Sequence, residues 1–233
     1  MPTTSYSLPF TDRQQAGKLL GEALGDWRAA APAVLALPRG GVPVGLEVAR
    51  VLRAPLDVLV VRKLGAPLQP ELAVGAIAAG VTFVDPRLVA ATGASDAYLA
   101  RRIQEERLEL ARREAAYRGD RPPVAVKGRT IIVVDDGLAT GATARAAVRA
   151  LRQAGAARVI LAVPVGSPDS VESLRTEADA VVCLHTPPWF RAVGEAYSDF
   201  SQTSDAEVRS CLEEAEQWTG TPSGGQWNVA PPR

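Results

Sequence analysis

The sequence predicts an α/β fold of three layers, with a mostly parallel sheet flanked by helices. The main observation is that short apolar runs alternate with stretches of helical periodicity, which is the pattern of β-α-β units. These units occur in both halves of the chain, so their strands should form one sheet covered on both faces. The length of 233 residues and the 47% of hydrophobic residues suit one substantial domain with a packed core.

The first half of the chain predicts a helix and one β-α-β unit. Residues 11–14 (TDRQ) have capping-box spacing and open a helical pattern that runs to about residue 30. A strand at 33–37, a helix at 42–52 and a second buried strand at 56–61 should follow. A Gly-rich loop comes directly after the first of these strands.

An excursion from this core is expected in the middle of the chain. The apolar segments 72–79 and 81–84, separated by Gly80, should form a small hairpin or flap. Ser95 has the character of an N-cap for a charged helix that ends near residue 117.

The second half predicts a more regular β-α-β unit and two further elements. Gly155 should end the helix of this unit, and Ser167 with Pro168 combines a cap with a first-turn proline. After an irregular aromatic stretch, a short helix is expected at about 205–217, and residues 219–233 should be a disordered tail. The expected strands are 130–134, 158–163 and 180–184, and the helix of the unit is 142–153.

Charge and composition argue against several classes of protein. Lys and Arg together number 26, as do Asp and Glu, so no net charge attracts the chain to nucleic acid or to an anionic membrane. The arginines of 101–121 are interleaved with glutamates, which indicates a solvated or subunit-facing helix. Residues 1–10 lack the features of a signal peptide, and no apolar run approaches the ~18 residues of a membrane span.

The cysteines and the histidine indicate a reducing, cytoplasmic setting. Cys183 lies in an apolar run and Cys211 in a polar segment, and their spacing fits neither a disulfide framework nor a metal site. His185 is the only histidine, which removes most metal sites and most histidine-based triads. A lone histidine at a strand end is usually structural, although it could act on an acceptor as a donor or base.

The segment 131–143 carries the most informative pattern. A buried strand ends in two adjacent acids, Asp135 and Asp136, at the carboxyl edge where open α/β sheets bind ligands. A turn of small and hydroxyl residues (139–143) then leads into a helix N-terminus, whose N–H groups and dipole attract phosphate. The carboxylates suit the vicinal hydroxyls of a ribose or a hydrated magnesium ion. An ordinary solvated turn with a capping threonine is the alternative.

This segment resembles the signature with which type I phosphoribosyltransferases bind 5-phosphoribosyl 1-diphosphate (PRPP). The signature has four apolar residues, two acids, three variable positions and Thr-Gly-x-Thr. The resemblance implies that Asp135 and Asp136 hold the ribose hydroxyls and, through water, a magnesium ion. It also implies that the turn wraps the 5-phosphate with Ala139, Thr140, Gly141, Ala142 and Thr143.

The Gly-rich loop at 38–41 (PRGG) extends the resemblance. In this family the loop after the first core strand cups the pyrophosphate, often through a cis peptide bond, so Gly40 and Gly41 would line it. Arg39 is the implied pyrophosphate ligand, because a guanidinium binds phosphate oxygens bidentately. A Gly-rich turn with an exposed arginine is the alternative.

A basic pair also matches the family. Arg62 and Lys63 stand at the expected end of the second core strand, where several members carry basic residues that reach the leaving pyrophosphate. The alternative is a pair of charges that marks a strand end. Residues 65–75 then occupy the place of the mobile loop that closes over the reaction.

The resemblance covers residues 33–184 and implies the type I phosphoribosyltransferase fold within a single domain at 1–218. A helical insert is expected at about 95–118 and a C-terminal hood at about 185–200. The runs RKLGAP, FRAVG and YSDF are similar to a bacterial subgroup whose members have no assigned acceptor.

In this family the hood covers the acceptor. The resemblance therefore implies that Trp189, Phe190 and Tyr197 offer flat apolar surfaces to it, although these rings could instead seal the edge of the sheet. Enzymes that act on 6-oxopurines commonly have an aspartate where this chain has Ala139, so such an acceptor is not expected. Pyrimidine-like, adenine-like and non-nucleobase acceptors stay open.

The expected activity is magnesium-dependent transfer of the 5-phosphoribosyl group from PRPP to a small acceptor, with release of pyrophosphate. Arg39 and Lys63 would take up negative charge on the leaving group, while Asp135 and Asp136 would fix the ribose near the developing positive charge. The alternatives are a non-catalytic PRPP-binding regulator and a hydrolase or phosphorylase-like activity on a ribosyl phosphate. The family also implies a homodimer.

Overall fold

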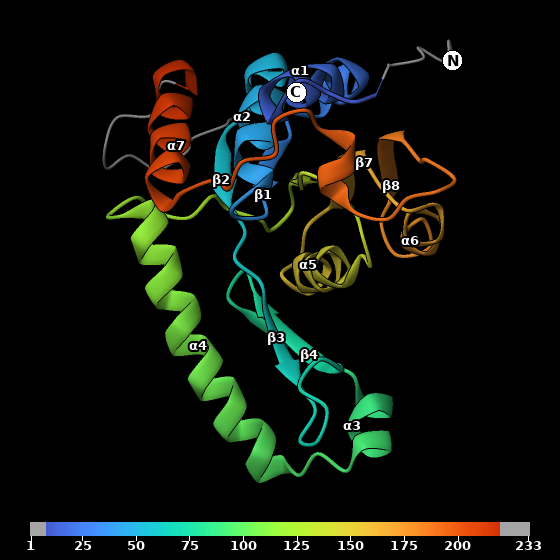
Figure 1. Cartoon of the computed structure of the whole chain (residues 1–233). Coiled ribbons are helices and arrows are strands. Elements are labelled where there is room, and N and C mark those ends of the chain that lie inside the picture. Colours follow the sequence, from blue (N-terminus) through green and yellow to red (C-terminus); the bar gives the residue numbers. More distant parts are fainter. Residues whose placement is uncertain (1–7, 220–233) are drawn as a thin grey trace.

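Two sheets organise the computed structural model, which describes residues 8–219 (Figure 1). The larger sheet has five parallel strands in the order β2-β1-β6-β7-β8, and the smaller has three antiparallel strands in the order β3-β4-β5. The strands of the larger sheet are β1 (Ala33–Ala36), β2 (Leu56–Val58), β6 (Thr130–Val134), β7 (Arg158–Val165) and β8 (Ala180–His185).

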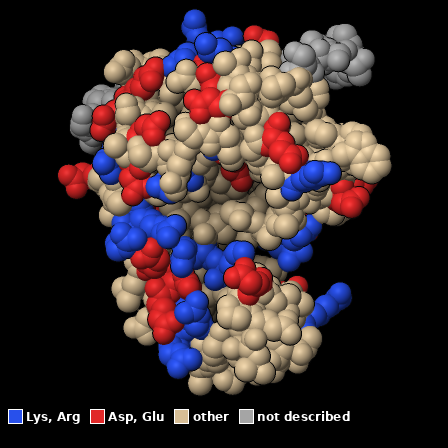
Figure 2. All heavy atoms as spheres, in the orientation of Figure 1, with Lys and Arg blue, Asp and Glu red and all other residues tan. Residues whose placement is uncertain are grey.

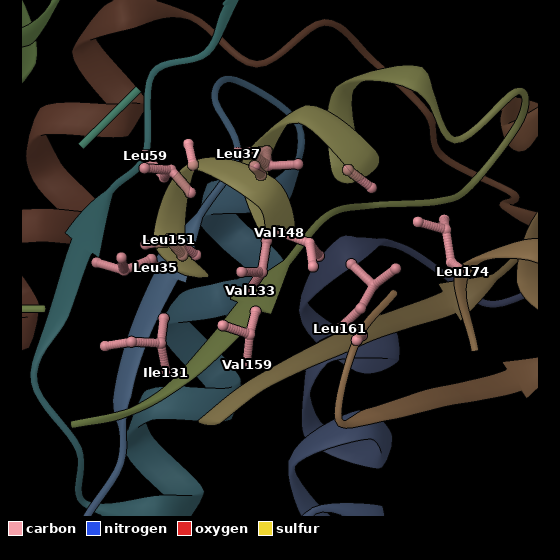
Figure 3. Packing of buried hydrophobic residues seen from close by; sticks show 14 of the residues in the cluster. Leu35, Leu37, Leu59, Ile131, Val133, Val148, Leu151, Val159, Leu161 and Leu174 are labelled. Carbon is pink, nitrogen blue, oxygen red and sulfur yellow. The ribbon is translucent and has the colours of Figure 1, made fainter. Parts of the chain in front are cut away.

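Helices cover both faces of the larger sheet, so the expected three-layer α/β fold is confirmed. Val34 and Ile132 are paired in register and face α1 and α2, whereas the next pair, Leu35 and Val133, faces α5 and α6 (Figure 3). Each fully buried aliphatic side chain of this kind stabilises the fold by about 1.5–3 kcal/mol. The helices are α1 (Arg13–Ala23), α2 (Gly41–Leu52), α5 (Ala142–Gln153) and α6 (Pro168–Leu174), and a 3₁₀ helix, η1 (Gly25–Ala30), follows α1.

The adjacent strands β1 and β6 define a topological switch point. The helix after β1, α2, packs on one face of the sheet, and the helix after β6, α5, packs on the other. The two connecting loops therefore leave the sheet in opposite directions, and the carboxyl ends of the strands at such a point are where open α/β sheets bind ligands. The loops are residues 37–40 and 135–141.

The first helix begins one residue later than its capping pattern predicts. Asp12 is the N-cap, and its Oδ1 accepts a hydrogen bond from the Gln15 amide at 2.8 Å. The amide of Thr11 donates to Oε1 of Gln15 at 2.6 Å, so the cap spans 11–15 rather than 11–14. Arg13 becomes the first helical residue, and the α-helix ends at Ala23 rather than near 30.

A second lobe projects from the β2 edge of the larger sheet (Figure 1). The predicted hairpin on either side of Gly80 is confirmed, but a third strand and a short helix after Asp85 were not expected. The predicted strand at 56–61 ends at Val58, because the chain leaves the larger sheet there and enters the smaller one. The lobe contains β3 (Arg62–Gly65), β4 (Ala73–Ala78), β5 (Val81–Val84), α3 (Pro86–Thr92) and α4 (Asp96–Arg118).

The long helix α4 anchors this lobe to the core. Ser95 caps it, as expected, by accepting a hydrogen bond from the Tyr98 amide at 3.2 Å. At its other end Arg118 donates to the buried carboxylate of Asp57 on β2 at 3.1 Å, and that carboxylate also accepts from the Val124 amide at 3.0 Å. A buried carboxylate requires such partners, so these contacts fix the C-terminal end of α4 beside the edge strand.

The remaining elements follow β8. A short 3₁₀ helix, η2 (Val193–Ala196), is followed by α7 (Asp205–Thr219), which packs against α2, α4 and β2. No helix among residues 8–219 is long and apolar enough to cross a membrane. The disordered tail predicted at 219–233 lies outside the described residues except for Thr219, which ends α7.

Candidate functional site

The acid pair lies at the switch point, where the sequence placed it. Asp135 and Asp136 directly follow β6, and both are partly buried. The amide of Asp136 donates to Oδ1 of Asp135 at 2.9 Å, which orients the first carboxylate along its own backbone. Two adjacent acids are therefore held at the carboxyl edge of the sheet.

The loop after β1 packs directly on these acids. A Cβ at Gly41 would lie 2.8 Å from the carbonyl oxygen of Val134 and 2.9 Å from Cα of Asp135, and a Cβ at Gly40 would overlap the carboxylate of Asp136. Glycine is therefore the only residue that allows this approach at either position. The peptide bond between Pro38 and Arg39 is cis.

The turn at 139–143 presents exposed groups at the start of α5. Ala139, Thr140 and Thr143 are exposed, whereas Gly141 is buried with φ 71° and is the N-cap of the helix. The left-handed conformation at Gly141 favours glycine, and the N–H groups of the first helical turn have no partner within the helix. The turn can therefore receive a phosphate group.

Two serines hold this turn in place and were not anticipated from the sequence. The carbonyl oxygen of Ala139 accepts hydrogen bonds from Ser167 Oγ at 2.9 Å and from Ser170 Oγ at 2.6 Å. Ser167 was expected to cap the following helix, and it does so by accepting from the Ser170 amide at 3.3 Å. Ser167 also bonds the Ala139 carbonyl because the segment between β7 and α6 passes beside the turn.

Arg13 is the most important residue that sequence reasoning missed. Its Nε donates to Oδ2 of Asp136 at 2.9 Å, its Nη2 lies 2.9 Å from the same oxygen, and its Nη1 donates to the Ser201 carbonyl at 2.7 Å. Its guanidinium carbon lies 4.0 Å from the ring centroid of Phe200. One local signal existed, since a cation in the first turn of a helix opposes the helix dipole and therefore needs an acidic partner from elsewhere.

Burial dominates the electrostatics of the acid pair. Loss of solvent raises the pKa of Asp135 well above its ordinary value, and the neighbouring charge of Asp136 raises it further. Burial also raises the pKa of Asp136, and the Arg13 guanidinium opposes that rise. A cation close to Asp135 would therefore favour its ionised form.

The acid pair suits a magnesium site in which water and substrate supply the other ligands. The acid pair offers oxygen ligands, which magnesium prefers, but residues 8–219 contain no group of three or more acidic, histidine or cysteine side chains positioned to hold a metal ion. Magnesium commonly keeps several waters and is bound by one or two carboxylates together with substrate phosphates. Asp135 and Asp136 fit that kind of site.

The basic residues are distributed differently from the prediction. Arg39 lies in the loop beside the acids, is partly exposed, and makes a long ion pair of 3.7 Å with the exposed Asp205. Arg62 is at the start of β3 rather than at the end of the second core strand, and its Nη2 lies 2.6 Å from Oε2 of the buried Glu106. Lys63 is exposed on the next position of the strand, where side chains point to the opposite side.

Basic side chains gather across the middle of one face of the molecule, between the core above and the hairpin lobe below (Figure 2). Acidic side chains are interspersed among them, so the face has a mixed charge and does not form a continuous basic surface.

The aromatic residues expected in the hood separate into two groups. Trp189 is 86% exposed, and Phe190 is partly buried against the cluster that contains Phe10 and Val165. Tyr197 is only 6% exposed, and its hydroxyl donates to the carbonyl oxygen of Asp136 at 2.5 Å. The structure therefore places Tyr197 in the core as a support for the acid pair and leaves Trp189 as the accessible ring.

Similarity to known proteins agrees with this geometry. The model of the phosphoribosyl transferase domain family matches residues 12–201. Two curated relatives from strains of Mycobacterium tuberculosis, each named as a candidate phosphoribosyl transferase, are 48% identical over 209 residues, which are 89% of this chain and 47% of each relative. The chain thus spans about half the length of these relatives.

A solved structure is also similar over nearly its whole length. The crystal structure of the protein TT1426 from Thermus thermophilus is 46% identical, with a TM-score of 0.82, and the match covers 89% of this chain and 99% of that one. The family match and the acid pair at the switch point lead to one conclusion: this chain belongs to the phosphoribosyl transferase domain family.

Proposed function

We propose that this chain transfers the 5-phosphoribosyl group of PRPP to a small acceptor and releases pyrophosphate. The observation that carries the proposal is the presence of three features at the carboxyl edge of the sheet: the acid pair, the Gly40-Gly41 loop that packs on it and the exposed turn at the start of α5. The chain spans 47% of the length of its curated relatives, so the activity of the whole protein is proposed and is not taken over from them.

Each end of PRPP has a proposed set of ligands. The turn formed by Ala139, Thr140, Gly141, Ala142 and Thr143 receives the 5-phosphate, since backbone N–H groups and two hydroxyls meet there. The acid pair accepts hydrogen bonds from the ribose hydroxyls. Gly40 and Gly41 allow the pyrophosphate to approach the loop backbone, and Arg39, whose ion pair with the exposed Asp205 is long and weak, binds it.

The chemical step requires the protein to separate charge. As the bond between C1 and the pyrophosphate oxygen breaks, the ribose becomes positively charged and the leaving group gains negative charge. Asp135 and Asp136 lie on the ribose side and stabilise the first charge, while Arg39 and Lys63 stabilise the second. Asp135 and Asp136 would hold a magnesium ion through water, and that ion would supply positive charge to the leaving group.

The acceptor is proposed to enter under the exposed part of the hood. Trp189 offers a large accessible ring there, and Phe190 contributes part of its face. Ala139 has no carboxylate to exchange a proton with a 6-oxopurine. We therefore favour a pyrimidine-like, adenine-like or non-nucleobase acceptor.

One experiment separates transfer from its alternatives. The purified chain is incubated with PRPP and magnesium, with and without a panel of bases and small amines, and pyrophosphate release is followed. Release that depends on an acceptor supports transfer, and release without one indicates a hydrolase. Tight binding of PRPP without turnover indicates a regulator. Asp135→Asn and Asp136→Asn serve as controls, and an unchanged rate in both would contradict the proposed roles of the acids.

The proposal also covers the cellular compartment and the oligomeric state. Cys183 and Cys211 are free thiols, and burial raises their pKa values to about 12 and about 11, which suits unreactive cysteines in a reducing cytoplasm. We propose a homodimer that acts on small molecules, without nucleic acid or membrane as partner. Light scattering at working concentration tests the dimer, and a monomer there would contradict it.

A further inference from the structure

We propose that Ser167 and Ser170 are positioning residues for the turn at 139–143. Their hydroxyls hold the carbonyl group of Ala139 on the α6 side, so that the next N–H group, that of Thr140, points toward a bound phosphate. The inference rests on the proposed function for the identity of that phosphate. The orientation of the peptide group is a property of the protein without substrate.

The segment from the end of β7 into α6 packs along the turn. The amide of Leu138 donates to the Val165 carbonyl, and the amide of Ser167 donates to the Leu138 carbonyl, both at 2.9 Å. A Cβ at Gly141 would lie 3.0 Å from Cδ1 of Leu174 and 3.6 Å from Cβ of Ser170. The turn is therefore fixed in place relative to α6 on both sides of Ala139.

The two serines occupy one carbonyl oxygen completely. The Ala139 oxygen accepts from Ser167 Oγ at 2.9 Å and from Ser170 Oγ at 2.6 Å, and a carbonyl oxygen has two lone pairs. Ser170 is only 9% exposed, and this is the one hydrogen bond that its hydroxyl makes within residues 8–219. That hydroxyl does not cap α6, because the cap is Ser167. Its contact with the turn is therefore its role in the fold.

The geometry of the peptide group converts this anchor into a donor on the opposite side. The peptide bond between Ala139 and Thr140 is trans, so its C=O and N–H groups point in opposite directions. With the carbonyl group held on α6, the Thr140 N–H points away from α6, and Thr140 is exposed. Across the part of the chain that the structure describes, the amides of Thr140 and Gly141 donate to no protein group. Adjacent N–H groups of this kind bind anions.

Removal of the two hydroxyls would free the peptide group to rotate. The Ala139 oxygen, with its partial negative charge, would then face the phosphate in place of the Thr140 N–H group. The affinity for a sugar phosphate should fall for this reason, even though no group that contacts the phosphate has been replaced.

The test measures binding of ribose 5-phosphate by calorimetry, because this probe carries the phosphate without the pyrophosphate. Ser170→Ala removes one hydrogen bond and should raise the Kd about 3- to 10-fold, while circular dichroism shows a folded protein. Thr92→Val is the matched control. It removes a hydroxyl that donates to the Leu88 carbonyl at 2.7 Å in the second lobe, and it should bind like the wild type.

Ser167 both caps α6 and holds the turn, so its variants need a control for the cap. Ser167→Ala should raise the Kd by a similar factor, and Ser167→Thr, which keeps a hydroxyl, should recover most of that loss. Ser95→Ala, which removes only the cap of α4, should not raise the Kd. The double variant Ser167→Ala/Ser170→Ala frees the carbonyl group and should raise the Kd about 10- to 100-fold.

The amide proton of Thr140 reports the orientation of the peptide group directly. In the wild type its NMR resonance should move downfield when ribose 5-phosphate is added, because the amide then donates to a phosphate oxygen. In the double variant this shift should be lost. A folded double variant with the wild-type Kd, or with the wild-type shift at Thr140, would overturn the inference.

The proposed transfer activity can fail separately. If the serine variants weaken ribose 5-phosphate binding as expected but PRPP gives no acceptor-dependent release of pyrophosphate, the transferase function is wrong and the positioning role stands. If transfer occurs but the variants bind like the wild type, the positioning role is wrong and the function stands. A wild type that takes up no ribose 5-phosphate would also overturn the positioning role.

Discussion

Gly40 lies so close to Asp136 that a methyl group at position 40 would overlap the carboxylate. Gly40→Ala should therefore displace either the loop or the acid, at a cost of about 1–3 kcal/mol in the free energy of unfolding. PRPP binding should be lost as well, because the loop and the acid are both proposed ligands and pack directly on each other. Calorimetry and thermal unfolding measure the two effects.

A second glycine provides the control for this prediction. Gly25 has no heavy atom within 4 Å of the position its Cβ would take, so Gly25→Ala should leave both quantities unchanged. A Gly40→Ala variant that resembles Gly25→Ala would show that the loop and the acid do not constrain each other.

The two ends of α5 offer a matched pair for the phosphate site. Gly141 and Gly155 have φ 71° and 83°, so alanine at either position should destabilise the fold by about 1–2 kcal/mol. Only Gly141→Ala should also weaken PRPP binding, since its end of the helix faces the proposed 5-phosphate. Equal losses of affinity in both variants would argue against a phosphate site at the start of α5.

Asp135 should lower the free energy of unfolding although it supports the transfer activity. Burial raises its pKa above the ordinary value of 3.8, so the folded protein holds the proton more tightly than the unfolded chain. The free energy of unfolding should therefore fall as the pH rises from about 3.8 to the raised pKa. Asp135→Asn should reduce this fall and raise Tm at neutral pH, while lowering the transfer rate about 10²-fold or more.

Calorimetric melting between pH 4 and 8 without PRPP checks the stability of this variant. Asp136→Asn is the comparison, because it replaces the carboxylate that pairs with the partly buried Arg13 guanidinium and should lower Tm instead. If Tm of the wild type and of Asp135→Asn depended on pH in the same way, the pKa of Asp135 would not be raised in the folded protein.

Substitutions should show that Arg62 has a structural role and that Lys63 has a functional one. Arg62→Ala removes charged hydrogen bonds to the buried Glu106 and should cost about 1.5–3 kcal/mol, although Arg102 still pairs with that glutamate. Lys63→Ala should leave Tm unchanged and lower kcat/KM for PRPP. If Arg62→Ala lowered kcat/KM while Lys63→Ala did not, the proposed assignment of the leaving-group cation would be reversed.

The hood residues Tyr197 and Trp189 should behave in opposite ways. Tyr197→Phe deletes the hydrogen bond to the Asp136 carbonyl and should cost about 1 kcal/mol with little effect on the KM of an acceptor. Trp189→Ala removes an exposed ring and should raise that KM without changing Tm. An acceptor KM that is insensitive to Trp189 would place the acceptor elsewhere.

Much of the fold could be predicted because its signals are local. The strand at 130–134, the helix at 142–153 and the caps at Ser95 and Ser167 follow from periodicity and side chains that bond within four residues, and the structure confirms them. The strand β3 was missed because Arg62 and Lys63 follow an apolar run that continues without a turn signal. Its pairing with β4 is a contact between segments, which periodicity does not report.

The sequence by itself determined the α/β class and the acid pair with the turn that follows it, since segment 131–143 carries strand, acids, turn and helix start without interruption. Only the tertiary structure decided that Arg13 pairs with Asp136 and that the Tyr197 hydroxyl bonds the Asp136 carbonyl from the core. The physical reason is distance along the chain: Arg13 and Asp136 are 123 positions apart, and Tyr197 and Asp136 are 61 apart. Such contacts form only when the sheet and its helices bring the segments together, so no local pattern identifies the partner.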